Sequence, residues 1–310
     1  MTLKILLIFL AAIIIGCGRL DANLHNASVV ENYEFDNYAG ETDFKIDDPS
    51  HKIFSQYIHD LQEEIFSDDG VHGKVPVRSY FIGQKERIGE DDYTVILYCH
   101  GNRDHMDFYW PRTKLLANVG GNMHFGVLTL DYRGYGATEG PASEDGMYAD
   151  VAAAIQWLKT AGLKSENFVI YGFSMGTAPA TELTANPRIE DFAPSKIILE
   201  SPFASAEVMV QDSALLALPA SYFTNLKIDN AEEIKKLTNV PLLWIHGEDD
   251  DFLDIETHGS VVYKNHPGIE GVDKFGYRVV GGTHSNLPEA FGSIPFEDYK
   301  TTILDFIENR

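Results

Sequence analysis

The sequence predicts an α/β fold in which a mostly parallel sheet carries helices on both faces. From about residue 77 onward, short continuous apolar runs recur, bounded by Gly, Asn or Pro and without the alternation of a half-exposed strand. Such runs suit strands that are buried on both faces, as in a parallel sheet. The runs cover residues 95–98, 127–130, 168–171, 197–199, 242–245 and 277–280.

Helical stretches lie between these runs, and the alternation of strand and helix indicates βαβ units. The clearest stretch is 144–161, where Val151, Ala154 and Leu158 share one helix face and Gly162 provides a suitable stop. Ligands in such sheets bind at the carboxyl ends of the strands. The residues that directly follow each predicted strand are therefore the first candidates for a functional site.

Length and charge narrow the classes of function. The chain has 310 residues, of which 44% are hydrophobic, enough for one large domain or two small ones. Acidic residues outnumber basic ones by 47 to 24, for a net charge of −23. Such a surface repels phosphate backbones, so we expect no nucleic-acid partner.

The first 17 residues have the features of a targeting segment. Lys4 precedes an apolar run of 11 residues, 5–15, which suits a signal peptide better than a membrane span. The run ends in Ile-Ile-Gly-Cys17, which resembles the lipobox of bacterial lipoproteins. We therefore expect lipidation at Cys17 and anchoring in the bacterial cell envelope. The residue after Cys17 is Gly18 and not the aspartate associated with retention in the inner membrane, so the outer membrane is favoured. The alternatives are ordinary secretion to the periplasm or beyond, and an uncleaved anchor.

The next segment lacks a periodic apolar pattern. Residues 18–50 are polar and rich in Asn and Asp, so we expect a tether between the anchor and the globular part. Apolar residues at helical spacing then predict an amphipathic helix over 51–67, at the start of a domain that covers 51–310. Cys99 is the one cysteine besides Cys17, so no disulfide framework is expected, and its place in an apolar run predicts a small buried side chain.

The stretch Gly172-Phe-Ser174-Met-Gly176 is a candidate nucleophile site. A G-x-S-x-G pattern alone is weak, but this one lies between a predicted strand and a stretch compatible with helix. A nucleophile elbow requires that context, because a sharp turn exposes the serine and leaves no room for side chains two residues away. The following helix N-terminus also offers unpaired N–H groups to a developing oxyanion. Ser174 is therefore the predicted nucleophile.

The run 95–98 leads into Cys99-His100-Gly101-Asn102, an early strand followed by a loop that suits a second oxyanion donor. We expect the backbone N–H groups of Asn102 and Met175 to form the oxyanion site, and we expect His100 to position the loop. His105 and Asp107 are expected at the surface or the rim of the site.

Asp131-Tyr-Arg133-Gly-Tyr-Gly follows the run 127–130, and we expect Asp131 and Arg133 to pair and brace the loop beside the pocket.

A serine nucleophile needs a general base and an acid that orients it. The run 242–245 is followed by His246-Gly-Glu-Asp249-Asp250-Asp251, and spacing favours Asp250 as the acid, with Asp249 as the alternative. A calcium loop is disfavoured, because the Gly and the distal Glu of that motif are missing. We expect neither a metal nor a cofactor.

The last predicted strand ends in Gly281-Gly-Thr-His284, which places a histidine in a glycine-rich loop. His284 is the predicted base, in the chain order Ser174, Asp250, His284. His246 is expected to be structural, and for His258 both a structural and a functional role stay open.

Together these motifs resemble the α/β-hydrolase superfamily over residues 77–310. The motifs are HGN at 100–102, DYRGYG at 131–136, GFSMG at 172–176, LESPF at 199–203, HGEDD at 246–250 and GGTH at 281–284. They are most similar to its short-capped branch, which includes lysophospholipases, monoacylglycerol-type lipases and protein depalmitoylases. The resemblance implies a serine hydrolase with a small-molecule or lipid ester substrate. Arg103 and Asp104 depart from the small residues that relatives often carry there, which puts substrate choice in doubt.

The segment 202–239 has room for a short helical cap. Its apolar residues either line an acyl-chain site or pack against the sheet. We therefore expect a membrane-tethered enzyme that hydrolyses carboxylic esters or thioesters. The alternatives are a serine peptidase or amidase on the same triad and a non-catalytic envelope lipoprotein that keeps the fold for binding.

Overall fold

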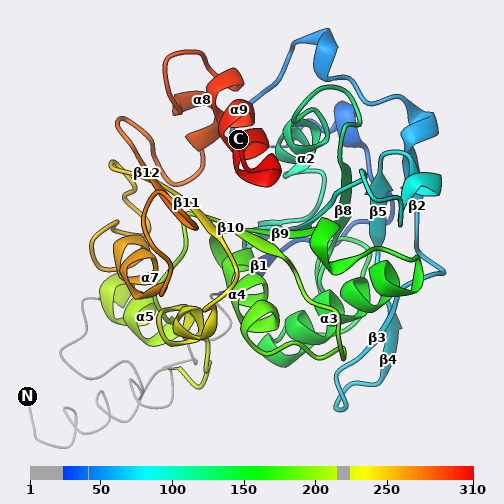
Figure 1. Cartoon of the computed structure of the whole chain (residues 1–310). Coiled ribbons are helices and arrows are strands. Elements are labelled where there is room, and N and C mark those ends of the chain that lie inside the picture. The colour runs from blue at the N-terminus through cyan, green and yellow to red at the C-terminus, as the bar shows by residue number, and fades with distance from the viewer. Residues whose placement is uncertain (1–23, 41, 215–223) are drawn as a thin grey trace, which may run out of the picture.

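The computed structural model describes residues 24–40, 42–214 and 224–310, and its centre is an eight-stranded sheet (Figure 1). The strand order is β2-β5-β8-β6-β9-β10-β11-β12, parallel from β8 to β12, with β5 and β2 added antiparallel at one edge. The strands are β2 (Ile58–Asp60), β5 (Ser79–Ile82), β6 (Val95–Cys99), β8 (Gly126–Leu130), β9 (Phe168–Phe173), β10 (Lys196–Glu200), β11 (Leu242–Gly247) and β12 (Lys274–Val279). The predicted α/β fold is confirmed.

All six predicted apolar runs form strands of this sheet. Five of these strands, β6, β8, β9, β10 and β11, are buried along their whole length, which explains why their sequences show no alternation. β12 lies at an edge and has exposed residues. The two antiparallel strands, β2 and β5, escaped the prediction because they are short and their residues do not form a long apolar run.

Helices cover both faces of the sheet (Figure 1). The helices are α2 (Trp110–Ala117), α3 (Glu144–Thr160), α4 (Thr177–Ala185), α5 (Ala206–Ala214), α6 (Asn230–Glu233), α7 (Gly259–Asn265), α8 (Leu287–Ala290) and α9 (Glu297–Glu308). Residues of α2 and α9 belong to one hydrophobic cluster and residues of α3, α4 and α7 to the other. The predicted helix 144–161 is confirmed as α3: the Ser143 side chain caps its N-terminus, and Gly162 follows its end with a φ of +93°.

The expected tether differs from what the structure shows. Residues 24–44, apart from residue 41, lie against the domain, and we call this segment the N-terminal arm. Its short strand β1 (Asn26–Ala27) pairs in parallel with β7 (Arg103–Asp104), and its first and last apolar residues, Leu24 and Phe44, are buried. The arm holds its apolar residues at irregular spacing, so each packs through its own tertiary contact and leaves no periodic signal.

The predicted helix over 51–67 is wrong. The segment forms a 3₁₀ turn at Ser55–Tyr57, then β2, and later β3 (Phe66–Asp68), which pairs with β4 (Lys74–Pro76). The free edge of β5 offers unpaired backbone groups, and β2 satisfies them by antiparallel pairing. The apolar residues that suggested a helix, such as Leu61 and Ile65, are still buried, but from an irregular backbone.

Two searches concern the described residues only. Within residues 24–40, 42–214 and 224–310, no helix combines the length and the apolar character that crossing a membrane requires. The same residues contain no group of three or more His, Cys, Asp or Glu side chains placed to hold a metal ion. The predicted signal segment 1–17, including Cys17, lies outside the described residues, as do residues 215–223 of the predicted cap.

Candidate active site

Ser174 lies in a sharp turn between strand β9 and helix α4. β9 ends at Phe173, a 3₁₀ turn covers Ser174–Gly176, and α4 begins at Thr177. Ser174 has a φ of +51°, a conformation uncommon for residues other than glycine, and this strain is of the kind that functional sites hold. The local sequence therefore folds into the strand–turn–helix arrangement that the G-x-S-x-G motif requires.

The two glycines of the motif are needed for steric reasons. A Cβ on Gly176 would overlap the carbonyl oxygen of Cys99, at the end of the neighbouring strand β6. A Cβ on Gly172 would lie 2.6 Å from the carbonyl oxygen of Gly176, inside the turn itself. Glycine is thus required at both positions because backbone passes close on either side of the serine.

His284 lies within hydrogen-bond distance of both Ser174 and Asp250. Its Nε2 is 2.9 Å from Ser174 Oγ, and its Nδ1 is 2.8 Å from Asp250 Oδ2. An ionised carboxylate only accepts, so Nδ1–H donates to Asp250, which leaves Nε2 as the acceptor for the serine hydroxyl. The His284 ring lies between the rings of Phe173 and Phe252, with centroid distances of 5.5 and 5.1 Å.

Asp250, and not its neighbour Asp249, is the acid that contacts His284. Asp250 is buried and Asp249 is exposed. Asp250 Oδ1 accepts the N–H groups of Phe252, at 3.0 Å, and Leu253, at 2.8 Å. Burial alone would raise the pKa of Asp250, but hydrogen bonds from His246, His284 and the backbone outweigh it and hold that pKa below its usual range. Asp250 is therefore ionised at neutral pH and can accept the Nδ1–H of His284.

His246 is a second histidine on the same carboxylate. Its Nε2 lies 3.1 Å from Asp250 Oδ2 and 3.0 Å from the carbonyl oxygen of Leu253. Both partners are acceptors, so the proton is on Nε2. The Nδ1 atom is buried against Gly259 and has no hydrogen-bond partner among the described residues. His246 thus contacts the same carboxylate oxygen as His284 and helps to orient Asp250, a role beyond the simple structural one expected.

The loop expected to carry an oxyanion donor follows β6 and borders the same pocket as Ser174. Asn102 lines that pocket, and Met175 follows Ser174 in the 3₁₀ turn. The Tyr135 hydroxyl donates to the Asn102 carbonyl oxygen at 3.1 Å and lies 3.6 Å from Met175 Sδ. One side chain of the DYRGYG motif therefore links the two residues that sequence reasoning assigned to the oxyanion site.

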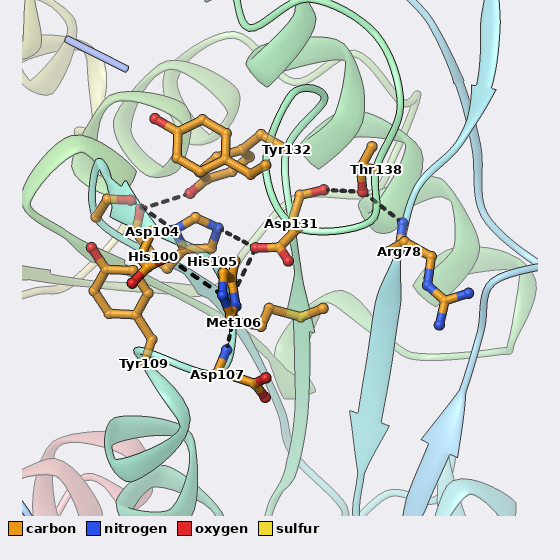
Figure 2. Close-up of polar contacts among 12 residues, drawn as sticks. Arg78, His100, Asp104, His105, Met106, Asp107, Tyr109, Asp131, Tyr132 and Thr138 are labelled. Carbon is orange, nitrogen blue, oxygen red and sulfur yellow. Dashed lines mark hydrogen bonds and ion pairs between the residues drawn. The ribbon is translucent and has the colours of Figure 1, made fainter. Parts of the chain in front are cut away.

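The predicted pair of Asp131 and Arg133 is wrong. Asp131 Oδ1 lies 3.1 Å from His100 Nε2 and accepts a hydrogen bond from the Met106 N–H at 3.0 Å (Figure 2). Arg133 binds Asp150 instead, at 2.8 Å, on helix α3. Both residues lie beyond the end of β8, and each finds its partner in a different part of the chain.

The contacts of Asp131 nevertheless support the expected function of the loop. His100 is fully buried and is held through Asp131, and its Nδ1 lies 2.7 Å from the Gly101 carbonyl oxygen. His105 and Asp107, which were expected at the surface or rim, are buried, 2% and 1% exposed. They belong to the network that fixes this loop and do not line the pocket.

The pocket above Ser174 has a volume of about 670 Å³. Its wall combines residues from the loops after β6, β9, β11 and β12 with residues of the N-terminal arm. The lining residues are His25, Asn26, Asp43, Asn102, Arg103, Phe108, Tyr109, Phe173, Ser174, Asp251, Phe252, Thr283, His284 and Ser285. None of the described residues of the predicted cap 202–239 lines it, and Met209 and Val210 of α5 belong to or pack against the hydrophobic core. For the described part of the cap, packing is therefore the better interpretation.

Sequence reasoning missed a buried arginine beneath this pocket. Arg112 on α2 donates to Glu200 Oε1 at 2.7 Å and to the carbonyl oxygen of Ser285 at 3.0 Å, next to His284. Ser201 Oγ donates to the carbonyl oxygen of His284 at 3.0 Å. The loop that carries His284 is thus held by two side chains from other strand ends and helices. Glu200 and Ser201 lie in the LESPF motif, which was the available signal, whereas nothing in the sequence of α2 distinguishes Arg112.

Comparisons with known proteins agree with this architecture. A family model described as alpha/beta hydrolase fold matches residues 94–217. The chain is 32% identical over 180 residues to alpha/beta hydrolase domain-containing protein aho-3 of Caenorhabditis elegans, covering 57% of this chain and 49% of that protein. It is also 32% identical over 170 residues to human alpha/beta hydrolase domain-containing protein 17B, covering 54% of each. The chain thus spans about half the length of the curated relatives it matches.

Solved structures of esterases share the fold. The esterase Pf2001 of Pyrococcus furiosus superposes with a TM-score of 0.65 at 17% identity, covering 92% of this chain and 97% of that one. Est1E of Butyrivibrio proteoclasticus superposes with a TM-score of 0.59 at 15% identity, covering 79% and 98%. The chain therefore has the α/β-hydrolase fold, and the family model and these relatives each match part of it.

Proposed function

We propose that this protein is a serine hydrolase that cleaves carboxylic esters or thioesters through an acyl-enzyme. The observation that carries the proposal is the continuous hydrogen-bonded series Ser174–His284–Asp250 at the base of a pocket of about 670 Å³. Nucleophile, base and orienting acid within hydrogen-bond reach form the arrangement that activates a serine. The esterase structures that share the fold make ester hydrolysis the first reaction to test.

In the proposed acylation step, Ser174 Oγ forms a bond to the carbonyl carbon of the substrate while His284 Nε2 takes the hydroxyl proton. Asp250 stabilises the resulting imidazolium through the Nδ1–H bond and keeps the ring in place. The tetrahedral intermediate collapses, the bond to the leaving group breaks, and His284 returns the proton to the departing oxygen or sulfur. Water then repeats these steps on the acyl-enzyme and releases the carboxylic acid and free Ser174.

The developing oxyanion is assigned to the backbone N–H groups of Met175 and Asn102. Met175 is at the start of the turn that leads into α4, where N–H groups are without helical acceptors and the helix dipole favours negative charge. The bond from Tyr135 to the Asn102 carbonyl holds the second donor near the first. Fixed donors of this kind contribute to the rate because they need no reorganisation when charge develops.

The test is hydrolysis of p-nitrophenyl esters from acetate to palmitate by the protein without residues 1–17, with Ser174→Ala alongside. We expect activity that the mutation abolishes, and the preferred chain length measures the depth of the pocket. Labelling of folded protein by a fluorophosphonate probe, dependent on Ser174, provides a second readout. Labelling without ester hydrolysis would move the proposal to amides or peptides. No labelling and no hydrolysis would favour a binding protein that keeps the fold without the chemistry.

We also propose that Cys17 carries a lipid that anchors the enzyme to the bacterial envelope, with the outer membrane favoured by Gly18. The sequence Ile-Ile-Gly-Cys17 after the apolar run supports this proposal. Metabolic labelling with a fatty-acid analogue should mark the full-length protein, and Cys17→Ser should abolish the label. Unchanged labelling of Cys17→Ser would contradict the proposal and favour ordinary secretion or an uncleaved anchor.

A further inference from the structure

The N-terminal arm contributes three residues to the wall of the active-site pocket. His25 and Asn26 lie at one end of the arm and Asp43 lies near the other, and all three line the cavity above Ser174. The arm precedes every motif of the hydrolase domain, so these residues enter the site only through tertiary contacts. The arm borders the pocket but contains none of the proposed catalytic residues. It is therefore placed to influence which substrates bind.

The arm is held by the same loop that carries the assigned oxyanion donor. The Asn26 N–H donates to the Asn102 carbonyl oxygen at 2.9 Å, and β1 pairs with β7 directly after it. Asp104 accepts bonds from Ser28 Oγ and from the Tyr38 hydroxyl, the latter at 2.7 Å. Arm and loop therefore form one hydrogen-bonded unit. This explains why residue 104 is a charged Asp and not the small residue that relatives often carry there. The Asp104 side chain anchors the arm and does not line the pocket.

A second carboxylate secures the middle of the arm. Asp107 Oδ2 accepts the Glu34 N–H at 2.7 Å, and Oδ1 accepts the Phe35 N–H at 2.8 Å. Around this point Phe35 packs against Trp110 and Tyr80, with ring centroids 4.7 and 5.0 Å apart. These contacts hold the middle of the arm against the domain.

Asp43 is the arm residue whose charge matters most. Its side chain is 10% exposed and lies 3.7 Å from the Arg112 guanidinium. Glu200 binds that guanidinium more closely, at 2.7 Å, and it also accepts bonds from the hydroxyls of Tyr171 and Tyr299. Two carboxylates thus share one arginine, which leaves negative charge at the pocket wall.

The other charged groups of the pocket wall have a weaker electrostatic effect on a bound substrate. Arg103 lies over the ring of Phe108, 5.4 Å from its centroid, and both Arg103 and Asp251 are exposed, so water and salt screen them. The charge of Asp43 acts at lower local dielectric, because the side chain is largely buried. Burial raises the pKa of Asp43, while the charge of Arg112 acts in the opposite direction.

We propose that the N-terminal arm is an integral wall of the active site and that Asp43 is its specificity-determining residue, favouring esters that carry a cationic group. The proposal rests on the proposed hydrolase function. Arg112 does not neutralise both Glu200 and Asp43, and a cationic group near Asp43 would balance the remaining negative charge. An anionic group there would be repelled by the Asp43 carboxylate. The preferred substrates are accordingly esters or thioesters with an amine or quaternary ammonium group within reach of the arm.

The experiment compares cationic esters with their uncharged carbon analogues. Acetylcholine and 3,3-dimethylbutyl acetate differ only on the leaving-group side. The 4-nitrophenyl esters of 4-(trimethylammonio)butanoic acid and 5,5-dimethylhexanoic acid differ only on the acyl side. In at least one pair, Asp43→Asn should lower the ratio of kcat/KM for the cationic over the neutral ester about tenfold, mainly through KM.

Two variants control for trivial effects. Asp47→Asn makes the same substitution at an exposed position a few residues further along the chain and should leave the ratio unchanged. Asp43→Glu keeps the charge and should keep the cation preference, which separates charge from folding if Asp43→Asn is unstable.

An identical ratio for wild type, Asp43→Asn and Asp43→Glu in both pairs, with hydrolysis intact, would overturn the inference and leave the hydrolase proposal standing. A wild type that hydrolyses none of these esters and is not labelled at Ser174 would overturn both.

Discussion

The proposed catalytic loops, which carry Ser174, Asp250 and His284, and the N-terminal arm border the same pocket but are held in place by different means. Ser174, Asp250 and His284 lie in the loops that follow β9, β11 and β12, and the parallel run β9-β10-β11-β12 places the carboxyl ends of these strands on the same side of the sheet. The arm has one two-residue strand, and its place depends on side chains such as Asp104 and Asp107. Position in the first region is set by the sheet, and in the second by individual hydrogen bonds and by the packing of single apolar side chains such as Phe35.

This difference indicates which part of the site tolerates substitution and which part does not. Strand register fixes the reacting groups through a cooperative network of backbone bonds, which a single side-chain change does not remove. An arm tied by individual hydrogen bonds can change its lining residues without disturbing the sheet. We therefore expect substitutions in the catalytic loops to abolish the reaction, and substitutions in the arm to alter affinity and selectivity.

The largest expected effect is loss of the nucleophile or the base. Ser174→Ala and His284→Ala should each lower kcat on a p-nitrophenyl ester by about 10⁴- to 10⁶-fold, because the two act as one unit. The double variant should be no slower than either single one. Additive losses in steady-state kinetics would show that Ser174 and His284 act independently and would break the catalytic side of the comparison.

The next effect distinguishes the two adjacent aspartates. Asp250→Asn should lower kcat by about 10³- to 10⁴-fold, because an amide at this position no longer selects the Nδ1–H form of His284. Asp249→Asn is the matched control, and since that side chain is exposed we expect a change of no more than about twofold. Equal losses for the two variants would contradict the assignment of Asp250.

A steric change at the elbow should be costly for stability as well. Gly176→Ala inserts a Cβ against the carbonyl of Cys99, and we expect the free energy of unfolding to fall by about 3 kcal/mol. The control is Gly121→Ala, at a φ of +112° but with no atom within 4 Å of the added Cβ, where backbone strain alone should cost about 1 kcal/mol. Urea unfolding measures both, and equal losses would mean that close packing does not constrain the elbow.

In the arm, Asp107→Ala should leave the N–H groups of Glu34 and Phe35 without their acceptor, at a cost of about 1–3 kcal/mol to local stability. We expect faster amide hydrogen exchange over 26–38, while the core strand β9 keeps its protection. The control is Asp47→Ala at an exposed site. Unchanged exchange in the arm would show that other contacts suffice to hold it.

The smallest effect is a pH dependence of stability that comes from Asp250. Its folded-state pKa is depressed, so its contribution is present above the unfolded-state pKa of about 3.9 and is lost as pH falls toward the folded-state value. The difference in free energy of unfolding between wild type and Asp250→Asn should therefore be about 1 kcal/mol or more at pH 6 and shrink below about pH 4. A difference that grows on acidification would contradict the depressed pKa.

The sequence signals for the loops that carry Ser174, Asp250 and His284 are local. A strand followed within a few residues by Ser174, Asp250 or His284 can be recognised from the chain itself, and the parallel sheet brings such loop ends together. The choice of Asp250 over Asp249 needed only the spacing to the next apolar residue. The prediction of the fold depended on the same local signal of continuous apolar runs.

The contacts of the arm, and the buried contacts of Arg112 that hold the His284 loop, could not be predicted, because the residues involved are distant in sequence. Asp107 binds backbone atoms more than 70 residues earlier, and Arg112 reaches Glu200 from 88 residues away. Neither spacing leaves a pattern in the sequence. The pairing of Asp131 with Arg133 failed for the same reason: proximity in sequence suggested a partner, but tertiary contacts supplied better ones.

The position of His25 in the pocket wall has a consequence for where the proposed enzyme would meet its substrates. Cys17 precedes His25 by eight residues, and a chain of that length spans at most about 29 Å even when fully extended. A lipid on Cys17 would thus confine the pocket to a layer next to the bilayer that is thinner than the bilayer itself, about 40 Å. Molecules embedded in or adsorbed to that surface would be met at high effective concentration, while those in bulk solution would have to diffuse to it.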